Sequence, residues 1–501
     1  MKLFLQQGPW DWEPERYKYS AEQMMLTLFP GEKPEYPQGD IHMLPESEDA
    51  ASFRLDRGEQ LAVLSAEVHL GGKKQTAEVS FSAEKLDDTR EHIYHHIQHA
   101  LKQAFYQAGT ALLGKEPPWG ALTGVRPVKL PTRAIEAGKT ADEAREELER
   151  EYHVSPLRAQ LAVDCAKASV AALDSLHDRE VSLYIGIPFC PTRCAYCSFV
   201  SADVGRTMKL VAPYRDALCE ELEVTGKVLK ENGLTVRSLY MGGGTPTTLS
   251  ASQMDRVLSK CEEVLPLDGC TEYTVEAGRP DTISREKLVV LRDHHIGRTS
   301  INPQTLEDHV LAAIGRRHSA GDIQKAYALA REVGFDCIIM DLIAGLPQDT
   351  FEGFQRSLEG VLALDPENVT VHTLALKKGS TLMERGDVIP GGPVVEQMLD
   401  YSLDALRGKG YAPYYLYRQK YMSGSLENVG WAKPGTESLY NIVMMEELQT
   451  VLSVGGGGVT KLIRDGKIVR LPNPKYPHDY LSSREKILAQ KDEIAAFYGK
   501  P

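Results

Sequence analysis

The sequence has no run of 18 consecutive apolar residues, so we expect no membrane-spanning helix. Its first residues, MKLFLQQGPWDWEPERYKYS, contain no sustained apolar stretch and no small-residue cleavage site, which predicts a protein without a secretory signal that stays in the cytoplasm. Positive charge is also scarce, because 57 Lys and Arg oppose 70 Asp and Glu, a formal net charge of −13. This balance and the lack of a basic tail argue against nucleic acid or an anionic membrane as partners.

Cysteine is too sparse for a disulfide framework, with eight residues in a chain of 501. Five of them are scattered through helical or strand-like patterns, where we expect them to pack as small apolar side chains. The other three, Cys190, Cys194 and Cys197, lie close together directly after an apolar run. Only these three have the spacing of metal ligands.

Three kinds of site fit closely spaced thiols, and they differ in how many ligands they need. A structural zinc site needs four ligands, and neither a second cysteine pair nor a suitably placed histidine is evident. A redox C-x-x-C dithiol would use Cys194 and Cys197 and leave Cys190 unexplained. Three thiolates suit a [4Fe–4S] cluster in which one iron has no protein ligand. The spacing therefore favours a cluster whose open iron can bind a small molecule.

The chain is too long for one average domain, and its pattern of apolar and polar residues changes twice. Residues 1–175 contain an alternating apolar–polar stretch around Gly71-Gly72, which predicts a β-hairpin, followed by helical patterns. We expect this region to be a separate α+β domain. Residues 176–410 predict a core barrel, and residues 411–501 predict a C-terminal accessory region beside it.

Six short β-branched segments alternate with helical segments in the core region, which predicts parallel strands joined by right-handed crossovers. The six segments are VSLYIGIPF, VRSLYMGGG, EYTVEAG, RTSINPQ, FDCIIMDLIAGL and NVTVHTLAL. The fold class is therefore α/β, with a partial (β/α)6 barrel that is shorter than the eight-unit barrel. In such sheets the reactive site lies at the carboxyl ends of the strands.

Unusual residues fall at those strand ends. The GGGTP stretch, Gly242 to Pro246, lets backbone approach a ligand closely, although a tight turn is an equally simple explanation. Glu276 ends the third strand, and a carboxylate there needs a cation or a hydrogen-bond partner if it is buried. A structural ion pair would serve that need as well as a bound cofactor.

At this point the sequence resembles the radical S-adenosylmethionine (SAM) enzymes, and within them the oxygen-independent coproporphyrinogen III oxidase family, most nearly its Bacillus-type branch. The stretches that carry the resemblance are WGALTGVRP, YIGIPFCPTRCAYCSF, YMGGGTPTTL, TVEAGRPDTI, SINPQTLEDHVLAAIGRRH, MDLIAGLP, TVHTLALKKGS and YYLYRQKYMSGSLENVGWAKPGTESLYN. The resemblance implies that Cys190, Cys194 and Cys197 hold a [4Fe–4S] cluster. It also implies contacts to SAM from nine residues, namely Tyr184, Gly243, Gly244, Thr245, Glu276, Gln304, Arg316, Asp341 and Ala375.

The family chemistry implies an oxidoreductase that converts two propionates of coproporphyrinogen III into vinyl groups in anaerobic haem biosynthesis. The implied partners are a tetrapyrrole substrate and an external one-electron donor such as flavodoxin or ferredoxin, with the protein itself a monomer. Two features depart from the family. Ser198 and Phe199 follow the third cysteine where the well-studied oxidases have a further cysteine, and Tyr440 stands where the related haem chaperones have histidine. A haem chaperone and another radical reaction, such as tetrapyrrole ring opening, therefore stay open as alternatives.

Overall fold

The structure is a computed structural model, and it describes residues 1–6, 12–45, 47–197, 202–376, 380–419, 423–464 and 466–499. The chain forms two compact units, one of residues 1–163 with 418–426 and the other of residues 164–417 with 427–501. The domain boundaries predicted from the sequence, at residues 175 and 410, stay a prediction. The two units are defined by the density of contacts within them, which does not show which parts fold separately. In the described part of the chain, no helix is long and apolar enough to span a membrane.

The first unit is built on a four-stranded sheet in the order β1-β2-β3-β4. Strand β1 pairs parallel with β2, and the other pairs are antiparallel. The predicted hairpin is confirmed, since Gly71 and Gly72 have positive φ angles between β3 and β4. The strands of this unit are β1 (Lys2–Gln6), β2 (Ala50–Arg57), β3 (Leu61–Leu70) and β4 (Lys73–Ser82).

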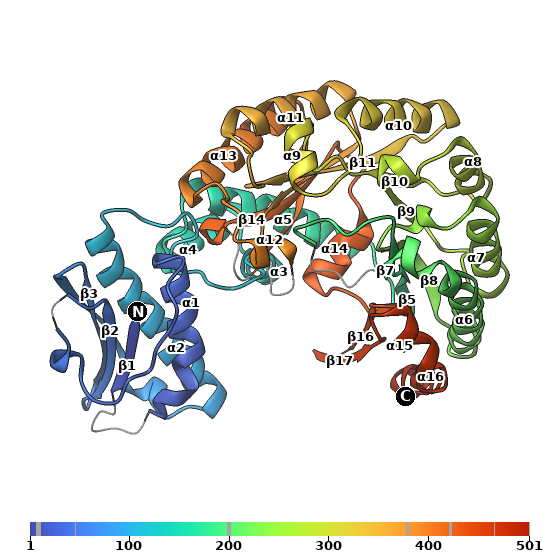
Figure 1. The fold of residues 1–501 in the computed structure, drawn as a ribbon. Helices are drawn as coiled ribbons and strands as arrows, with labels where there is room; N and C mark the ends of the chain where they lie inside the picture. Colours follow the sequence, from blue (N-terminus) through green and yellow to red (C-terminus); the bar gives the residue numbers. More distant parts are fainter. Residues whose placement is uncertain are drawn as a thin grey trace. The chain divides into compact units, whose positions relative to one another are not determined.

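Helices α1 and α2 pack against this sheet, as Figure 1 shows in blue. Helix α2 begins where the Thr89 side chain accepts a hydrogen bond from the His92 amide, and it ends at Gly114 in the left-handed conformation. The helices are η1 (Pro14–Tyr17), α1 (Lys18–Leu28), η2 (Ile41–Met43), η3 (Ala83–Leu86), α2 (Arg90–Leu113), α3 (Lys129–Glu136) and α4 (Ala141–Tyr152); α5 (Pro156–Asp174) continues into the second unit.

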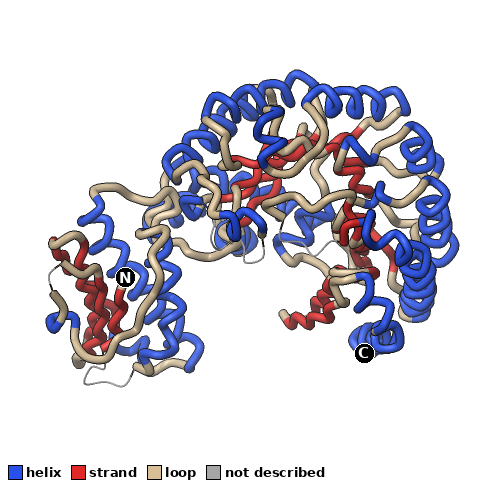
Figure 2. The backbone as a smooth tube through the Cα atoms, in the orientation of Figure 1, coloured by secondary structure: helices blue, strands red, loops and turns tan. Residues whose placement is uncertain are grey.

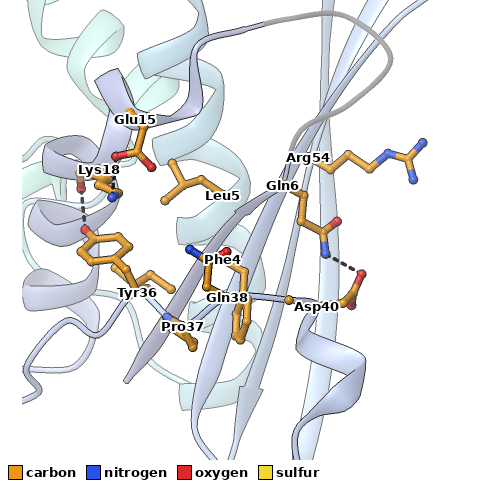
Figure 3. A pocket seen from close by; sticks show the side chains of 12 residues that line it. Phe4, Leu5, Gln6, Glu15, Lys18, Tyr36, Pro37, Gln38, Asp40 and Arg54 are labelled. Carbon is orange, nitrogen blue, oxygen red and sulfur yellow. Dashed lines mark hydrogen bonds and ion pairs between the residues drawn. The ribbon is translucent and has the colours of Figure 1, made fainter.

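A cavity of about 480 Å³ lies in the first unit beside β1, between Phe4, Tyr36 and Asp40 (Figure 3). Its polar side chains pair with one another. The Gln6 Nε2 donates to Asp40 at 2.9 Å, and the Tyr36 hydroxyl donates to Glu22 at 2.8 Å. The cavity contains none of the residues predicted to bind a cofactor.

The second unit contains the predicted barrel, an open curved sheet with helices along its outer side (Figure 2). Six parallel strands follow one another in chain order across the sheet, as the alternation of strand and helix predicts. These strands are β5 (Glu180–Ile187), β8 (Thr235–Gly243), β9 (Glu272–Gly278), β10 (Arg298–Ile301), β11 (Cys337–Ala344) and β12 (Asn368–Thr373). A short parallel pair, β6 (Phe189–Cys190) and β7 (Ala202–Asp203), stands apart from this sheet.

Each crossover helix packs its apolar stripe on the outer side of the strands, and α6, α7, α8, α10 and α11 form the outer arc in Figure 1. Capping boxes at Ser250 and Ser319 start α7 and α10, so these two boundaries are set by local sequence. The helices are α6 (Val204–Glu231), η4 (Pro246–Thr248), α7 (Ala251–Val264), η5 (Pro280–Thr282), α8 (Arg285–Asp293), α9 (Asp308–Ala313), α10 (Ala320–Val333), α11 (Phe351–Leu364), α12 (Thr381–Arg385) and α13 (Gly392–Gly408).

The C-terminal region extends both edges of the barrel sheet. Strand β14 (Glu427–Ala432) pairs antiparallel with β12, and β15 (Val451–Gly455) pairs parallel with β5. Between them, α14 (Leu439–Glu446) places Tyr440 against Tyr240 of β8. The remaining elements are β13 (Ala412–Arg418), η6 (Ser423–Ser425), β16 (Val459–Arg464), β17 (Lys467–Pro472), α15 (Pro477–Ser482) and α16 (Arg484–Tyr498). Strands β14 and β15 of the C-terminal region are therefore part of the barrel sheet.

Candidate functional site

The carboxyl ends of the parallel strands bring the predicted site residues to one edge of the sheet. Tyr184 lies in β5, and Cys190 lies at the end of β6, three residues beyond β5. Gly243 ends β8 and Glu276 lies near the end of β9. The others lie in or just after the next three strands, with Gln304 after β10, Asp341 in the middle of β11 and Ala375 after β12.

The glycine-rich turn packs against the segment that leads into the cysteines. The Gly244 amide donates to the Ile187 carbonyl and the Thr245 amide donates to the Phe189 carbonyl, both at 2.7 Å. A Cβ atom on Gly244 would lie 2.4 Å from the Phe189 carbonyl oxygen, so only glycine fits this position. We expected the glycines to let the backbone approach a ligand closely. At Gly244 the close neighbour is instead the backbone of the chain itself.

The cysteine loop, residues 190–197, is held by backbone and side-chain contacts. The Cys190 sulfur lies 3.5 Å from the Thr245 hydroxyl, and the Cys197 amide donates to the Cys194 carbonyl at 3.1 Å. The Ala195 amide donates to the Ile314 carbonyl at 2.9 Å. Cys194 is buried, whereas Cys190 and Cys197 are partly exposed. Ser198 and Phe199 lie outside the described residues.

Within the described ranges, no three His, Cys, Asp or Glu side chains converge closely enough to hold one metal ion. A single tetrahedral ion draws all its ligands to bonds of about 2.0–2.3 Å. A [4Fe–4S] cluster is different, because each cysteine binds its own iron and the sulfurs stay farther apart. The described residues therefore offer no ready site for a single metal ion. The three thiols remain a suitable set of ligands for a [4Fe–4S] cluster.

Arg279 contacts the cysteine loop, and the sequence patterns did not single it out. It lies one residue beyond β9, is 3% exposed, and its Nη1 donates to the Thr192 hydroxyl at 2.8 Å and to the Cys194 sulfur at 3.8 Å. Its Nε and Nη2 bind both oxygens of Asp281 at 2.9 and 2.8 Å. One signal for this role was present in the sequence: Arg279 is a charged residue three positions after Glu276, just beyond the end of the strand.

Arg316 is buried beside the same loop. Its Nη1 donates to the Asn302 carbonyl at 2.6 Å and its Nη2 donates to the Tyr196 hydroxyl at 3.2 Å. Burial alone would lower the pKa of Arg316, but the neighbouring Tyr196 and Cys194 raise it overall, so the guanidinium stays charged. The structure thus places a fixed cation next to the thiols.

Glu276 is held by a stack of three tyrosines. The Tyr240 hydroxyl donates to Glu276 Oε1 at 2.5 Å, and the Tyr240 ring stacks on Tyr440 with centroids 4.6 Å apart and on Tyr184 at 6.4 Å. Burial raises the pKa of Glu276 to about 7, while the Tyr240 hydrogen bond opposes that rise. The carboxylate can therefore change its charge near neutral pH.

The remaining predicted residues are held in different ways. Gln304 has a φ angle of 68°, and its amide and carbonyl bond to Asp341 and Ile343 of β11 at 2.8 and 2.9 Å. The Asp341 side chain lies 3.8 Å from Nε2 of His372 in β12, a contact that the sequence did not indicate. Ala375 is partly exposed, directly beyond β12.

The site fits a small polar molecule bound beside a cluster. Among the described residues, four buried polar atoms near the ends of β8, β9 and β10 lack a hydrogen-bond partner. They are Ser300 Oγ, Asn302 Oδ1, Arg316 Nε and Tyr440 Oη. A cationic guanidinium, the partly exposed carboxylate of Glu276 and these unsatisfied groups suit the carboxylate and ammonium ends of an amino acid.

Comparison with known proteins agrees with this donor set. Residues 184–360 match the family model of the radical SAM superfamily. The chain is 38% identical over 436 residues, 86% of each chain, to the "Oxygen-independent coproporphyrinogen-III oxidase-like protein HemZ" of Bacillus subtilis. It is also 32% identical to the "Heme chaperone HemW" of Bacillus subtilis, over 52% of this chain and 66% of the relative.

A solved structure with a similar fold is the coproporphyrinogen III oxidase HemN of Escherichia coli, described as a radical SAM enzyme. The two align with a TM-score of 0.51 at 25% identity, over 64% of this chain and 72% of the other. The predicted fold class is thereby confirmed.

Proposed function

Because this chain belongs to the oxygen-independent coproporphyrinogen III oxidase-like family of radical SAM proteins, we propose that it converts two propionate side chains of coproporphyrinogen III into vinyl groups. The product is protoporphyrinogen IX. Each propionate loses CO2, one hydrogen atom and one electron, and an external acceptor takes up the electron. The relative that matches 86% of the chain and is itself oxidase-like carries this proposal.

Members of the superfamily bind a [4Fe–4S] cluster and SAM, and these are the cofactors of this chain. We assign the cluster to Cys190, Cys194 and Cys197, and the amino-acid end of SAM to the turn at Gly243, Gly244 and Thr245. The further assigned contacts to SAM are Tyr184, Glu276, Gln304, Arg316, Asp341 and Ala375. Once bound, the two cofactors supply a radical that abstracts a hydrogen atom from the substrate.

The residues of the chain act by binding and by fixing charge. Arg316 presents a permanent cation that suits the carboxylate of SAM. Glu276 accepts a hydrogen bond from Tyr240, and its ionised form suits the ammonium group. Tyr184, Tyr240 and Tyr440 stack beside these charges, and the buried Tyr440 reduces the water around them, which strengthens both interactions.

The cluster must receive an electron from outside, so the proposal includes a one-electron donor such as flavodoxin or ferredoxin. It also includes a monomeric protein that works in the cytoplasm on a tetrapyrrole and binds no nucleic acid. The net charge of −13 supports the last point, because it repels phosphate backbones.

A haem chaperone is the second candidate, and the similarity to HemW favours it. One observation counts against it. Tyr440, at the position of the histidine expected in chaperones, is 4% exposed and stacks against Tyr240. A buried phenol that packs on the barrel strands is not available as a ligand to haem iron.

One experiment separates the two candidates. The protein is reconstituted anaerobically with iron and sulfide, then given SAM, dithionite and coproporphyrinogen III, and the products are analysed by mass. Decarboxylation predicts two products that carry one and two vinyl groups. Their masses are lower than that of the substrate by one and two times the mass of formic acid. In a parallel sample that receives haem in place of coproporphyrinogen III, a chaperone forms a stable haem complex in the absorption spectrum. Such a complex, together with unchanged coproporphyrinogen in the first sample, would refute the proposal.

The matched controls concern the thiols. Cys194→Ala removes a proposed cluster ligand and should abolish both iron binding and SAM cleavage. Cys219→Ala removes a buried thiol of α6 outside the cysteine loop and should keep both. Equal iron content in the two variants would contradict the assignment of Cys194.

A further inference from the structure

We propose that Arg279 is a positioning residue for the cluster: its guanidinium orders the cysteine loop before the cluster assembles and makes the bound cluster easier to reduce. The inference rests on the proposed assignment of Cys194 as a cluster ligand. It goes further by naming a group that acts through this ligand without binding the iron itself. SAM and the tetrapyrrole play no part in it.

The first step is that one buried side chain holds two parts of the loop. Arg279 Nη1 donates to the Thr192 hydroxyl at 2.8 Å, to the Thr192 carbonyl at 3.1 Å and to the Cys194 sulfur at 3.8 Å. Thr192 and Cys194 flank the exposed Arg193, and Arg279 contacts the residue on each side of it. All three contacts are made by Nη1, which leaves Nε and Nη2 of the planar guanidinium to bind a second partner in a fixed geometry.

The second step is that the guanidinium is itself fixed. Nε and Nη2 bind both carboxylate oxygens of Asp281, a bidentate contact with 2.9 and 2.8 Å distances. The Arg279 amide donates to the Ala277 carbonyl at 2.7 Å, and the Thr282 amide donates to the Arg279 carbonyl at 3.0 Å. These two backbone hydrogen bonds and the Asp281 contact direct the side chain toward the loop.

The third step concerns the cluster's charge. A cluster becomes more negative when it is reduced, and N–H donors and positive charge near its sulfurs stabilise that state. Arg279 provides both at Cys194, and Asp281 lies on the far side of the guanidinium and offsets part of the charge. Removing the arginine and removing the aspartate should therefore move the reduction potential in opposite directions.

This opposition gives the test. Arg279→Gln, Arg279→Lys, Asp281→Asn and the wild type are reconstituted anaerobically without SAM or substrate. Iron and sulfide are quantified, and the reduced cluster is followed by electron paramagnetic resonance during a redox titration. We expect Arg279→Gln to titrate at a more negative potential, with at least a tenfold smaller ratio of reduced to oxidised cluster at a fixed potential, about 59 mV for one electron. Asp281→Asn should shift to a more positive potential.

The control is Arg285→Gln, which removes an exposed arginine of α8 that pairs with Glu332 and should leave the potential unchanged. If Arg279→Gln binds too little iron to titrate, Asp281→Asn still reports the sign of the shift, and Arg279→Lys, which keeps the positive charge, is compared with the wild type for iron content. A full cluster at unchanged potential in Arg279→Gln, or shifts of the same sign in the Arg279 and Asp281 variants, would overturn the proposal. Failure of decarboxylation by the wild type would not, because every readout concerns the cluster alone.

Discussion

Tyr240 and Glu276 lie on neighbouring strands and share a hydrogen bond of 2.5 Å, in which the phenol donates to the carboxylate. Tyr184 and Tyr440 stack against the Tyr240 ring and help to hold its hydroxyl toward Glu276. The contact opposes the effect of burial and keeps part of the Glu276 population ionised near neutral pH. The pair therefore sets the charge at the proposed ammonium end of the SAM site.

Tyr240→Phe removes this donor and should weaken SAM binding at pH 7 by about tenfold, the effect of losing one hydrogen bond to a charged group. The pKa of Glu276 rises when the bond is lost, so fewer carboxylates are ionised at that pH. At pH 8.5 the deficit should shrink, because Glu276 ionises in both proteins. Anaerobic calorimetry at the two pH values measures this, with the exposed Tyr476→Phe as control. A deficit that does not change with pH would exclude the mechanism.

The Glu276→Gln variant shows how the Glu276 carboxyl affects the free energy of unfolding. The folded-state pKa is about 7 against an ordinary value of 4.5, so the folded protein binds more protons than the unfolded chain between these pH values. Stability should therefore fall as the pH rises through this window and stay low above it. The glutamine removes that loss, and we expect the apo variant to be more stable than wild type by about 1–3 kcal/mol at pH 8 and equally stable at pH 4.

Urea unfolding of the two apo proteins across this pH range measures the difference. Glu352→Gln, at an exposed position in the first turn of α11, is the control. A variant that is less stable than wild type at pH 8 would show that Glu276 has a stabilising partner in the apo protein. At pH 8, where the wild-type carboxyl is ionised, the same variant should bind SAM more weakly, so stability and binding move in opposite directions at that pH.

Local signals in the sequence were sufficient for most of the barrel. Capping boxes at Ser250 and Ser319 fix helix starts, and alternating strands and helices leave few ways to connect a parallel sheet. The strand ends then had to meet at one edge, which is why Glu276 and the glycine turn could be grouped before any geometry was known. The family resemblance supplied the individual residues.

Contacts made by distant segments were beyond such reasoning. Strand β15 pairs with β5 although about 270 residues separate them, and no local pattern encodes that choice. Arg279 stands in a polar turn and looks like any exposed residue until Thr192 and Cys194 are placed beside it. The same holds for Tyr440, whose position depends on α14. The N-terminus of that helix is held by Glu272, which accepts from the Leu439 amide at 2.7 Å.

Gly244→Ala should damage the cysteine loop without touching a cysteine. The added Cβ atom would lie 2.4 Å from the Phe189 carbonyl and 2.8 Å from the Ile187 carbonyl, and backbone must shift to admit it. We expect a loss of stability of about 1–3 kcal/mol, the cost of overpacking, together with reduced iron content after reconstitution. Thermal unfolding and iron analysis measure both effects. Gly269→Ala is the control, since a Cβ there meets nothing within 4 Å, and equal behaviour of the two variants would be inconsistent with the packing described.

A buried ion pair holds the C-terminal segment to the edge of the barrel. Lys491 of α16 and Glu221 of α6 form an ion pair of 2.7 Å with side chains 3% and 1% exposed. Glu221 also accepts hydrogen bonds from the Gly455 amide and the Tyr480 hydroxyl, so one carboxylate joins α6, β15 and α15. Lys491→Met leaves this carboxylate buried without its cation, and we expect a loss of about 3 kcal/mol in the free energy of unfolding.

The double variant Lys491→Met with Glu221→Gln separates the ion pair from simple packing. It removes the uncompensated charge while the amide oxygen keeps the hydrogen bonds from the Gly455 amide and the Tyr480 hydroxyl, so it should recover at least half of the stability lost in Lys491→Met. Urea unfolding of the apo proteins measures all three, with Lys486→Met on the exposed face of α16 as control. Additive losses in the double variant would mean that Lys491 acts by packing alone. Because β15 borders β5, the strand that leads to the cysteine loop, Lys491→Met should also lower iron retention, and the double variant should restore it together with stability.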